Sequence, residues 1–283
     1  MVKPQKIKIT YDPFCIFSKE NVVVFFNNIK IMNKTLITTV PFGNVNKFPL
    51  EILEANNISY QINPYNTKLK EDQLLELTSS KIDTIIAGTE PLTRKVIENA
   101  KDLKHISRVG IGLDSVDLIA AREKGIKVSY TPDAPAPAVA ELTIGLMLSL
   151  LRGVHISNSE LHRGKWKRHY GRRIPEITIG IIGAGRIGTR VLRRLKSFGT
   201  PRILVNDLLP NLELNREFKL EWASKDVLYK ESDLISIHVP LTQKTKNMIC
   251  KKELAMMKHD AILINTSRGG IINEDDLYEC LNS

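Results

Sequence analysis

Three closely spaced glycines, followed at a distance by an aspartate, are the residues of this 283-residue chain whose types and spacing best predict chemistry. Gly183, Gly185 and Gly188 form a G-x-G-x-x-G turn, and Asp207 follows 19 residues after the last of them. The first glycine permits a tight turn, the second lets the backbone approach a phosphate, and the third lets a helix pack closely on the preceding strand. The pattern therefore predicts a phosphate-binding turn with a distant carboxylate.

The elements that must position these glycines are also visible in the sequence. The apolar run 177–182 predicts a buried parallel strand before the turn, and the run 202–207 predicts a second strand that ends on Asp207. Apolar residues recur at helical spacing between the two runs, so a helix is expected to begin at Arg186 and Ile187. The N–H groups and partial positive charge of its first turn suit a pyrophosphate. Strand, glycine turn, helix, strand and acid stand in the order that a dinucleotide site requires.

The acid at the end of the second strand predicts which dinucleotide binds. Asp207 can accept hydrogen bonds from both hydroxyls of the adenosine ribose, and its charge would repel a 2′-phosphate. Leu208, Leu209 and Pro210 follow it, so no basic residue stands directly after the acid to receive such a phosphate. We therefore predict NAD, rather than NADP, as the cofactor. The alternative is a glycine-rich turn in an α/β protein of another kind, which the strand context disfavours.

Composition limits the class of protein. The chain is 42% hydrophobic and 25% charged, and its length suits two domains. No apolar run approaches the ~20 residues that cross a bilayer, so no membrane partner is expected. Three cysteines, Cys15, Cys250 and Cys280, lie too far apart for a local metal site and are interpreted as reduced thiols of a cytoplasmic protein. No metal is expected.

A net charge of +10 raises the possibility of nucleic-acid binding. Residues 163–173 carry six basic residues and no acid, and Trp166 and Tyr170 lie among them. No helix-turn-helix or sheet motif accompanies this stretch. We therefore expect a solvated loop that attracts small anions, and nucleic acid is not an expected partner.

The pattern of strands and helices predicts two α/β domains. Residues 1–31 differ from the rest and are interpreted as an N-terminal extension without an assigned function. From Met32 strands and helices alternate, which predicts a parallel sheet, and the proline-rich segment 131–137 predicts a domain boundary. The expected strands are residues 35–40, 59–63, 84–88, 105–110 and 127–130 in the first domain, and 177–182, 202–207, 234–239 and 261–266 in the second. The expected helices are residues 48–56, 70–78, 93–100, 115–123, 138–151, one ending near His162, and 252–257.

Five motifs, in this order along the chain, resemble the D-isomer-specific 2-hydroxyacid dehydrogenases, the family that contains D-3-phosphoglycerate dehydrogenase. They are RVGIGLDSVD at 108–117, VAEL at 139–142, the glycine turn, HVPLT at 238–242 and INTSRGG at 264–270. The resemblance implies a flavodoxin-like substrate domain over residues 32–131, a Rossmann NAD-binding domain over residues 132–283, and an active site in the cleft between them. It also implies an oxidoreductase that acts on the CH–OH group of a D-2-hydroxy acid, or on the matching 2-oxo acid.

The resemblance assigns roles residue by residue. Arg268 would bind the substrate carboxylate and carbonyl oxygen, since a guanidinium fork meets a carboxylate bidentately and keeps its charge. His238 is implied as a cofactor contact rather than a catalytic acid, and Glu141 as a residue that fixes its helix. The backbone of three residues would hold the other side of the carboxylate: Val109, Gly110 and Ile111. The other implied cofactor contacts are Val239, Pro240, Thr242, Thr266 and Ser267.

Two departures from the family limit this interpretation. Family members continue past the Arg268 motif with a catalytic glutamate and a proton-donating histidine, whereas this sequence ends at Ser283. Loss of general acid catalysis typically costs about 10²–10⁴-fold in rate, so residues 1–283 are expected to bind NADH but to reduce 2-oxo acids poorly. The alternative function is an NAD-binding regulator similar to the C-terminal-binding-protein corepressors. Strand 261–266 is then expected at a sheet edge.

The second departure concerns the substrate. Members acting on 3-phosphoglycerate commonly carry an Arg-Ser pair after the third strand to receive the phosphate. Residues 87–93 read AGTEPLT here, and Glu90 would repel a phosphate if it faces the cleft. Activity on phosphoglycerate is therefore implied by the family but not supported by this loop.

Assembly is predicted from the longest helix. Residues 138–151 are apolar on more than one face, whereas a surface helix keeps a polar stripe. Family members place the matching helices at a two-fold interface, so a homodimer is expected.

Overall fold

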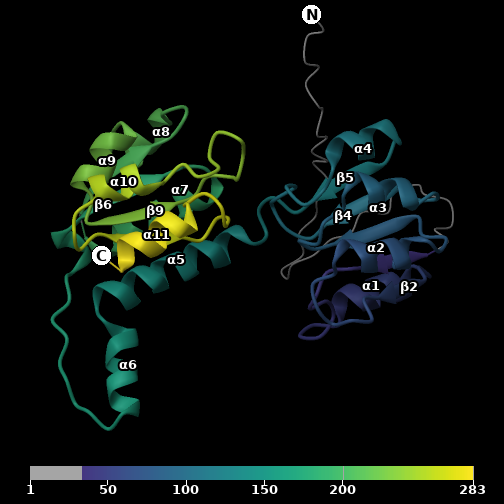
Figure 1. The fold of residues 1–283 in the computed structure, drawn as a ribbon, viewed down its shortest axis with the longest axis horizontal. Coiled ribbons are helices and arrows are strands. Elements are labelled where there is room, and N and C mark those ends of the chain that lie inside the picture. The colour runs from purple at the N-terminus through teal and green to yellow at the C-terminus, as the bar shows by residue number, and fades with distance from the viewer. Residues whose placement is uncertain (1–33, 200, 283) are drawn as a thin grey trace, which may run out of the picture. The chain divides into compact units, whose positions relative to one another are not determined.

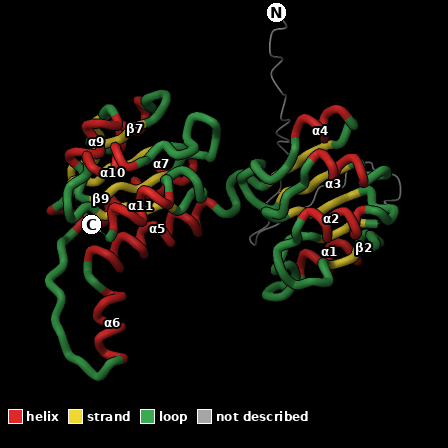
Figure 2. Tube along the Cα trace, in the orientation of Figure 1, coloured by secondary structure: helices red, strands yellow, loops and turns green. Residues whose placement is uncertain are grey.

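Each half of the chain builds a five-stranded parallel sheet from alternating strands and helices. Figures 1 and 2 show helices packed around the strands of each half. The computed structural model describes residues 34–199 and 201–282. The contacts divide the chain into two units between Ala134 and Pro135, within the proline-rich segment. The predicted N-terminal extension, residues 1–31, lies outside the described residues.

The sheet of the first unit has the strand order β2-β1-β3-β4-β5, which is the flavodoxin-like order. Its strands are short and mostly buried because helices cover a parallel sheet on both faces. They are β1 (Thr35–Ile37), β2 (Tyr60–Ile62), β3 (Thr84–Ala87), β4 (His105–Arg108) and β5 (Lys127–Tyr130). The helices are α1 (Phe48–Ala55), α2 (Glu71–Thr78), α3 (Arg94–Asn99) and α4 (Leu118–Glu123).

Helix α4 begins three residues later than the sequence predicts. The Asp117 side chain accepts a hydrogen bond from the Ala120 N–H at 2.8 Å and so caps the helix at that point. The residue before it, Val116, instead pairs with Leu92 in an isolated parallel bridge.

The sheet of the second unit has the order β10-β9-β6-β7-β8, with β6 at its centre. A dinucleotide-binding sheet has the same arrangement, in which the strand order reverses at the first strand, here β6. The strands are β6 (Thr178–Ile182), β7 (Arg202–Asn206), β8 (Leu220–Trp222), β9 (Leu234–Ile237) and β10 (Ile262–Asn265). The α-helices are α5 (Ala136–Leu151), α6 (Val154–His162), α7 (Arg186–Leu195), α8 (Leu212–Glu217), α9 (Lys225–Glu231), α10 (Lys251–Met256) and α11 (Glu274–Leu281), and two short 3₁₀ turns are η1 (Ile174–Glu176) and η2 (Lys196–Phe198).

Helix α5 carries one face into the core of this unit and leaves another exposed. Ala140, Thr143 and Met147 are fully buried. The opposite side exposes Leu142, Leu146 and Leu150, while α6 has no buried residue and extends away from the sheet (Figure 1). An apolar helix face is therefore left uncovered within this unit.

Among residues 34–199 and 201–282, no single helix is long and apolar enough to cross a membrane. Helices α5 and α6 would reach the necessary length only as a pair, and they are bent by 64° relative to each other.

Candidate active site

The predicted site residues of the second unit lie where four neighbouring strands end. The glycine turn follows β6, Asp207 follows β7, His238 follows β9, and Thr266 follows β10. Since parallel strands end at the same edge of a sheet, the four segments share the edge at which α/β proteins bind ligands.

The glycine turn has the geometry that a bound dinucleotide needs. Gly183 has a φ of +94°, and a Cβ there would lie 2.8 Å from the His238 carbonyl oxygen. A Cβ on Gly188 would lie 2.0 Å from the Gly183 carbonyl oxygen, so only glycine permits this helix–strand contact. At Gly185, in contrast, a Cβ would meet no atom within 4 Å. This open position precedes α7, whose first turn begins at Arg186 and Ile187 and has no side-chain cap, so the turn fits a pyrophosphate.

Asp207 is held in place by two backbone N–H groups. Its Oδ2 accepts from Ala184 N at 2.7 Å and its Oδ1 accepts from Leu208 N at 2.6 Å. The first of these bonds ties the carboxylate to the glycine turn itself. Each oxygen has a second lone pair, so the fixed carboxylate can still accept from two ribose hydroxyls. The role of Ala184 was not predicted, since it acts through its backbone.

His238 lies in an apolar environment that keeps its ring neutral. Burial lowers the pKa of His238 to about 4, from the ordinary value of 6.5. Its Nε2 is 2.9 Å from the Ser236 hydroxyl, and its buried Nδ1 has no hydrogen-bond partner in the part of the chain that the structure describes. Near neutral pH the ring is therefore uncharged and is not an imidazolium acid, which agrees with a role in the cofactor wall.

The loop after His238 is fixed by one threonine. The Thr245 hydroxyl donates to the Pro240 carbonyl at 2.6 Å and accepts from Thr242 N at 2.7 Å. Val239 packs beside the glycine turn, where its Cγ1 would lie 2.9 Å from a Cβ on Gly183. The sequence predicted Val239, Pro240 and Thr242 as cofactor contacts but not the organising role of Thr245.

The Arg268 loop is organised by the last residue of β10. Asn265 Oδ1 accepts from Ser267 N at 3.0 Å, and Asn265 Nδ2 donates to the Arg268 carbonyl at 2.7 Å. The Thr266 hydroxyl is 2.9 Å from the Thr143 hydroxyl of α5, which ties the loop to a buried helix face. The half-buried Arg268 donates from Nη1 to the Ser267 carbonyl at 2.9 Å. Asn265 was missed, although asparagine two residues before a turn is a recognisable Asx signal.

The predicted carboxylate-binding backbone belongs to the first unit. Val109 N donates to the Ala87 carbonyl at 2.8 Å, and Gly110 N donates to the Thr131 hydroxyl at 2.7 Å. Gly110 has a φ of +136°, which favours glycine, and a Cβ there would lie 2.5 Å from Nη1 of the buried Arg108. Ile111 is the next residue of this partly exposed turn.

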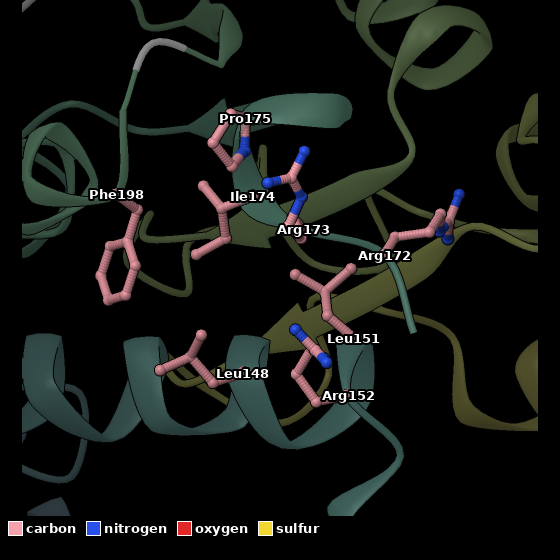
Figure 3. Close-up of a pocket in the computed structure, with 8 residues that line it drawn as sticks. All are labelled: Leu148, Leu151, Arg152, Arg172, Arg173, Ile174, Pro175 and Phe198. Atoms are coloured by element: carbon pink, nitrogen blue, oxygen red, sulfur yellow. The ribbon is translucent and has the colours of Figure 1, made fainter. Parts of the chain in front are cut away.

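Two arginines at the end of the basic stretch 163–173 are ion-paired. Arg172 pairs with Asp233 at 3.4 Å and with Asp260 at 3.1 Å, and Arg173 pairs with Glu176. Arg172 and Arg173 line a pocket of about 370 Å³ beside the end of α5, shown in Figure 3. None of the predicted site residues lines it, so this pocket does not coincide with the candidate site.

Comparison with known proteins relates both units to one family. The family model described as D-isomer specific 2-hydroxyacid dehydrogenase, NAD binding domain, matches residues 144–283. The chain is 41% identical to hydroxypyruvate reductase of Thermotoga maritima over 213 residues, which is 75% of this chain and 68% of that protein. It is also 41% identical to D-3-phosphoglycerate dehydrogenase of Methanocaldococcus jannaschii over 218 residues, 76% of this chain but only 41% of that protein.

Two solved structures are also similar to this chain. D-lactate dehydrogenase from Aquifex aeolicus, complexed with NAD and lactic acid, has a TM-score of 0.77 at 28% identity and covers 88% of this chain and 73% of its own. A glyoxylate reductase from Paecilomyes thermophila has a TM-score of 0.74 at 30% identity, and the match covers 88% of this chain and 77% of the reductase chain.

Proposed function

Because this chain belongs to the D-isomer-specific 2-hydroxyacid dehydrogenase family and takes NAD as its cofactor, we propose that it transfers a hydride between NAD and carbon 2 of a small D-2-hydroxy acid. The observation that carries the proposal is the single sheet edge of the second unit, which presents the glycine turn, Asp207 and the Arg268 loop together. The names of its relatives are those of enzymes, so an NAD-binding regulator without activity is not favoured.

The second unit would hold NAD through residues with separate tasks. The turn from Gly183 to Gly188 would receive the pyrophosphate, and Asp207 would receive the adenosine ribose. His238, Val239 and Pro240 would form a wall along the cofactor, and Thr242, Thr266 and Ser267 would complete its contacts. When bound, the nicotinamide supplies the hydride acceptor or donor.

Arg268 would bind the substrate carboxylate and draw electron density from the carbonyl oxygen. Its planar guanidinium can meet a carboxylate bidentately, and the Asn265 hydrogen bonds hold its backbone before substrate arrives. Val109, Gly110 and Ile111 remain the substrate contacts proposed for the first unit. His238 is neutral near pH 7, so we assign it to the cofactor wall and not to proton donation.

The substrate class proposed is the small 2-oxo acids, such as glyoxylate and hydroxypyruvate. It is supported by relatives named for these substrates. We also propose a homodimer, because α5 and α6 leave apolar side chains exposed on faces that the second unit does not cover.

The test is NADH oxidation by the purified protein with glyoxylate and hydroxypyruvate. Arg268→Ala is expected to lower kcat/KM at least about 10²-fold while NADH binding, followed by fluorescence, stays within twofold. The exposed Arg216 on α8 provides a matched control, since Arg216→Ala removes the same charge away from the site. NADH oxidation that Arg268→Ala leaves unchanged would contradict the proposal.

A further inference from the structure

A buried carboxylate occupies the ligand-binding edge of the first unit. In the order β2-β1-β3-β4-β5 the strand order reverses between β1 and β3. Open parallel sheets bind ligands outside the carboxyl ends of their strands, at such a reversal point. The segments that leave the sheet there are Thr38–Thr39 after β1 and Gly88–Glu90 after β3.

Glu90 joins these two segments. Its side chain is only 2% exposed, and Thr38 is fully buried. Glu90 Oε1 accepts from Gly88 N at 2.7 Å and from the Thr38 hydroxyl. The N–H and the hydroxyl are donors that could otherwise hold an anion from outside, so the protein has filled this position with its own carboxylate.

The backbone of the β3 loop is shaped to admit that carboxylate. A Cβ on Gly88 would lie 2.8 Å from Glu90 Oε2 and 2.7 Å from the Thr39 hydroxyl oxygen. Any larger residue at 88 would displace one of these groups. Glycine at this position therefore serves the placement of Glu90 and Thr39 against the end of β3.

The carboxylate of Glu90 is hydrogen-bonded to two uncharged donors. No lysine, arginine or histidine in residues 34–199 or 201–282 makes an ion pair with it; its recorded partners are the two donors named above. A buried carboxylate without a cation is costly to keep, and its field is weakly screened in a low-dielectric surrounding.

We propose that Glu90 determines substrate specificity, so that the enzyme accepts unphosphorylated 2-oxo and 2-hydroxy acids and rejects acids that carry a phosphate. This inference rests on the proposed function. A phosphate carries a charge of about −1.5 to −2 at pH 7 and is repelled by the fixed carboxylate. Two donors at this edge that could bind a phosphate, the Gly88 N–H and the Thr38 hydroxyl, are already bonded to Glu90. An uncharged hydroxymethyl group is not repelled by the carboxylate and does not need these two donors.

The experiment compares hydroxypyruvate with 3-phosphohydroxypyruvate by kcat/KM of NADH oxidation. The unaltered protein is expected to prefer hydroxypyruvate. Glu90→Gln keeps the size and an acceptor oxygen but removes the charge, and it is expected to reduce this preference by roughly tenfold or more, the scale of one charge–charge repulsion at an effective dielectric constant near 20. Glu98→Gln, which removes an exposed charge on α3 of the same unit, is the control and is expected to leave the preference unchanged.

A second variant, Thr89→Lys, allows the proposal to be tested if Glu90→Gln does not fold. Thr89→Lys places a cation on the exposed residue of the same loop without disturbing the buried network, and it is expected to reduce the preference in the same direction. Two results would overturn the role of Glu90 without overturning the proposed function. One is an active protein whose preference for hydroxypyruvate changes in neither variant, and the other is an unaltered protein that uses both acids equally. NADH oxidation that is unchanged in Arg268→Ala would overturn the proposed function and this inference with it.

Discussion

The buried His238 predicts that mild acid destabilises the second unit. Its pKa in the folded chain is about 4, and in an unfolded chain it is 6.5. Because the fold favours the neutral ring, protonation favours unfolding. The stability that depends on the neutral ring is complete above pH 6.5 and is lost as the pH falls towards 4.

The size of the effect follows from these two pKa values. Linkage between 6.5 and about 4 gives a loss of about 2 kcal/mol at pH 5, almost none at pH 7.5, and a limit of about 3 kcal/mol in stronger acid. The free energy of unfolding of a whole domain is typically about 5–15 kcal/mol, so a loss of about 2 kcal/mol should be measurable.

The assay is urea unfolding of the unaltered protein and of His238→Gln at pH 7.5 and pH 5. Trp166 and Trp222 both lie in the second unit, so their fluorescence follows its unfolding. Glutamine can keep a hydrogen bond to Ser236 but does not titrate. The difference between the two proteins therefore removes the contribution of every other titrating group. We expect the unaltered protein to lose about 2 kcal/mol more than the variant between the two pH values.

Two results would refute this reasoning. One is a difference below about 0.5 kcal/mol, which would mean that the ring is not held neutral by burial. The other is a His238 pKa near 6.5 in a proton NMR titration, joined to a pH–rate inflection that disappears in the variant. That pair of findings would instead identify His238 as the proton donor.

Further predictions concern the cofactor, the glycine turn and assembly. Asp207→Ala is expected to weaken NADH binding about tenfold and to narrow the preference over NADPH, and equal binding of both cofactors by the unaltered protein would contradict the assignment. Gly188→Ala forces a Cβ to within 2.0 Å of the Gly183 carbonyl oxygen, so we expect a loss of about 1–3 kcal/mol in urea unfolding together with weaker NADH binding; an unchanged midpoint would count against the close contact. Leu142→Asp combined with Leu146→Asp is expected to convert a dimer into a monomer in light scattering, and a monomer before substitution would end the dimer proposal.

Much of the fold could be predicted because buried parallel strands are continuous apolar runs. The starts of β1, β3, β4 and β5 agree with the prediction to the residue, and their ends to within about three residues. The edge strand β8 and the helices α8 and α9 were not predicted. Strand β8 has only three residues, of which Glu221 is exposed and the other two are half-buried, so it lacks a periodic apolar signal.

The chemistry of the site was harder to predict where it depends on distant partners. Asp207 could be identified from its place at the end of a strand, whereas the bond that orients it comes from the backbone of Ala184. Glu90 stands in a loop, where glutamate is usually solvated. Its burial depends on Thr38, which is 52 positions away, and no local pattern reports a contact of that kind.

The order of strands in the second sheet bears on how this protein could diversify. Asp207 follows β7 and Arg268 follows β10, and two strands, β6 and β9, separate them. Three interstrand spacings amount to about 14 Å, a distance at which the effects of substitutions usually add. A change of coenzyme preference at one strand end can thus arise without retuning the arginine at the other, so the two traits are free to evolve, or to be engineered, one at a time.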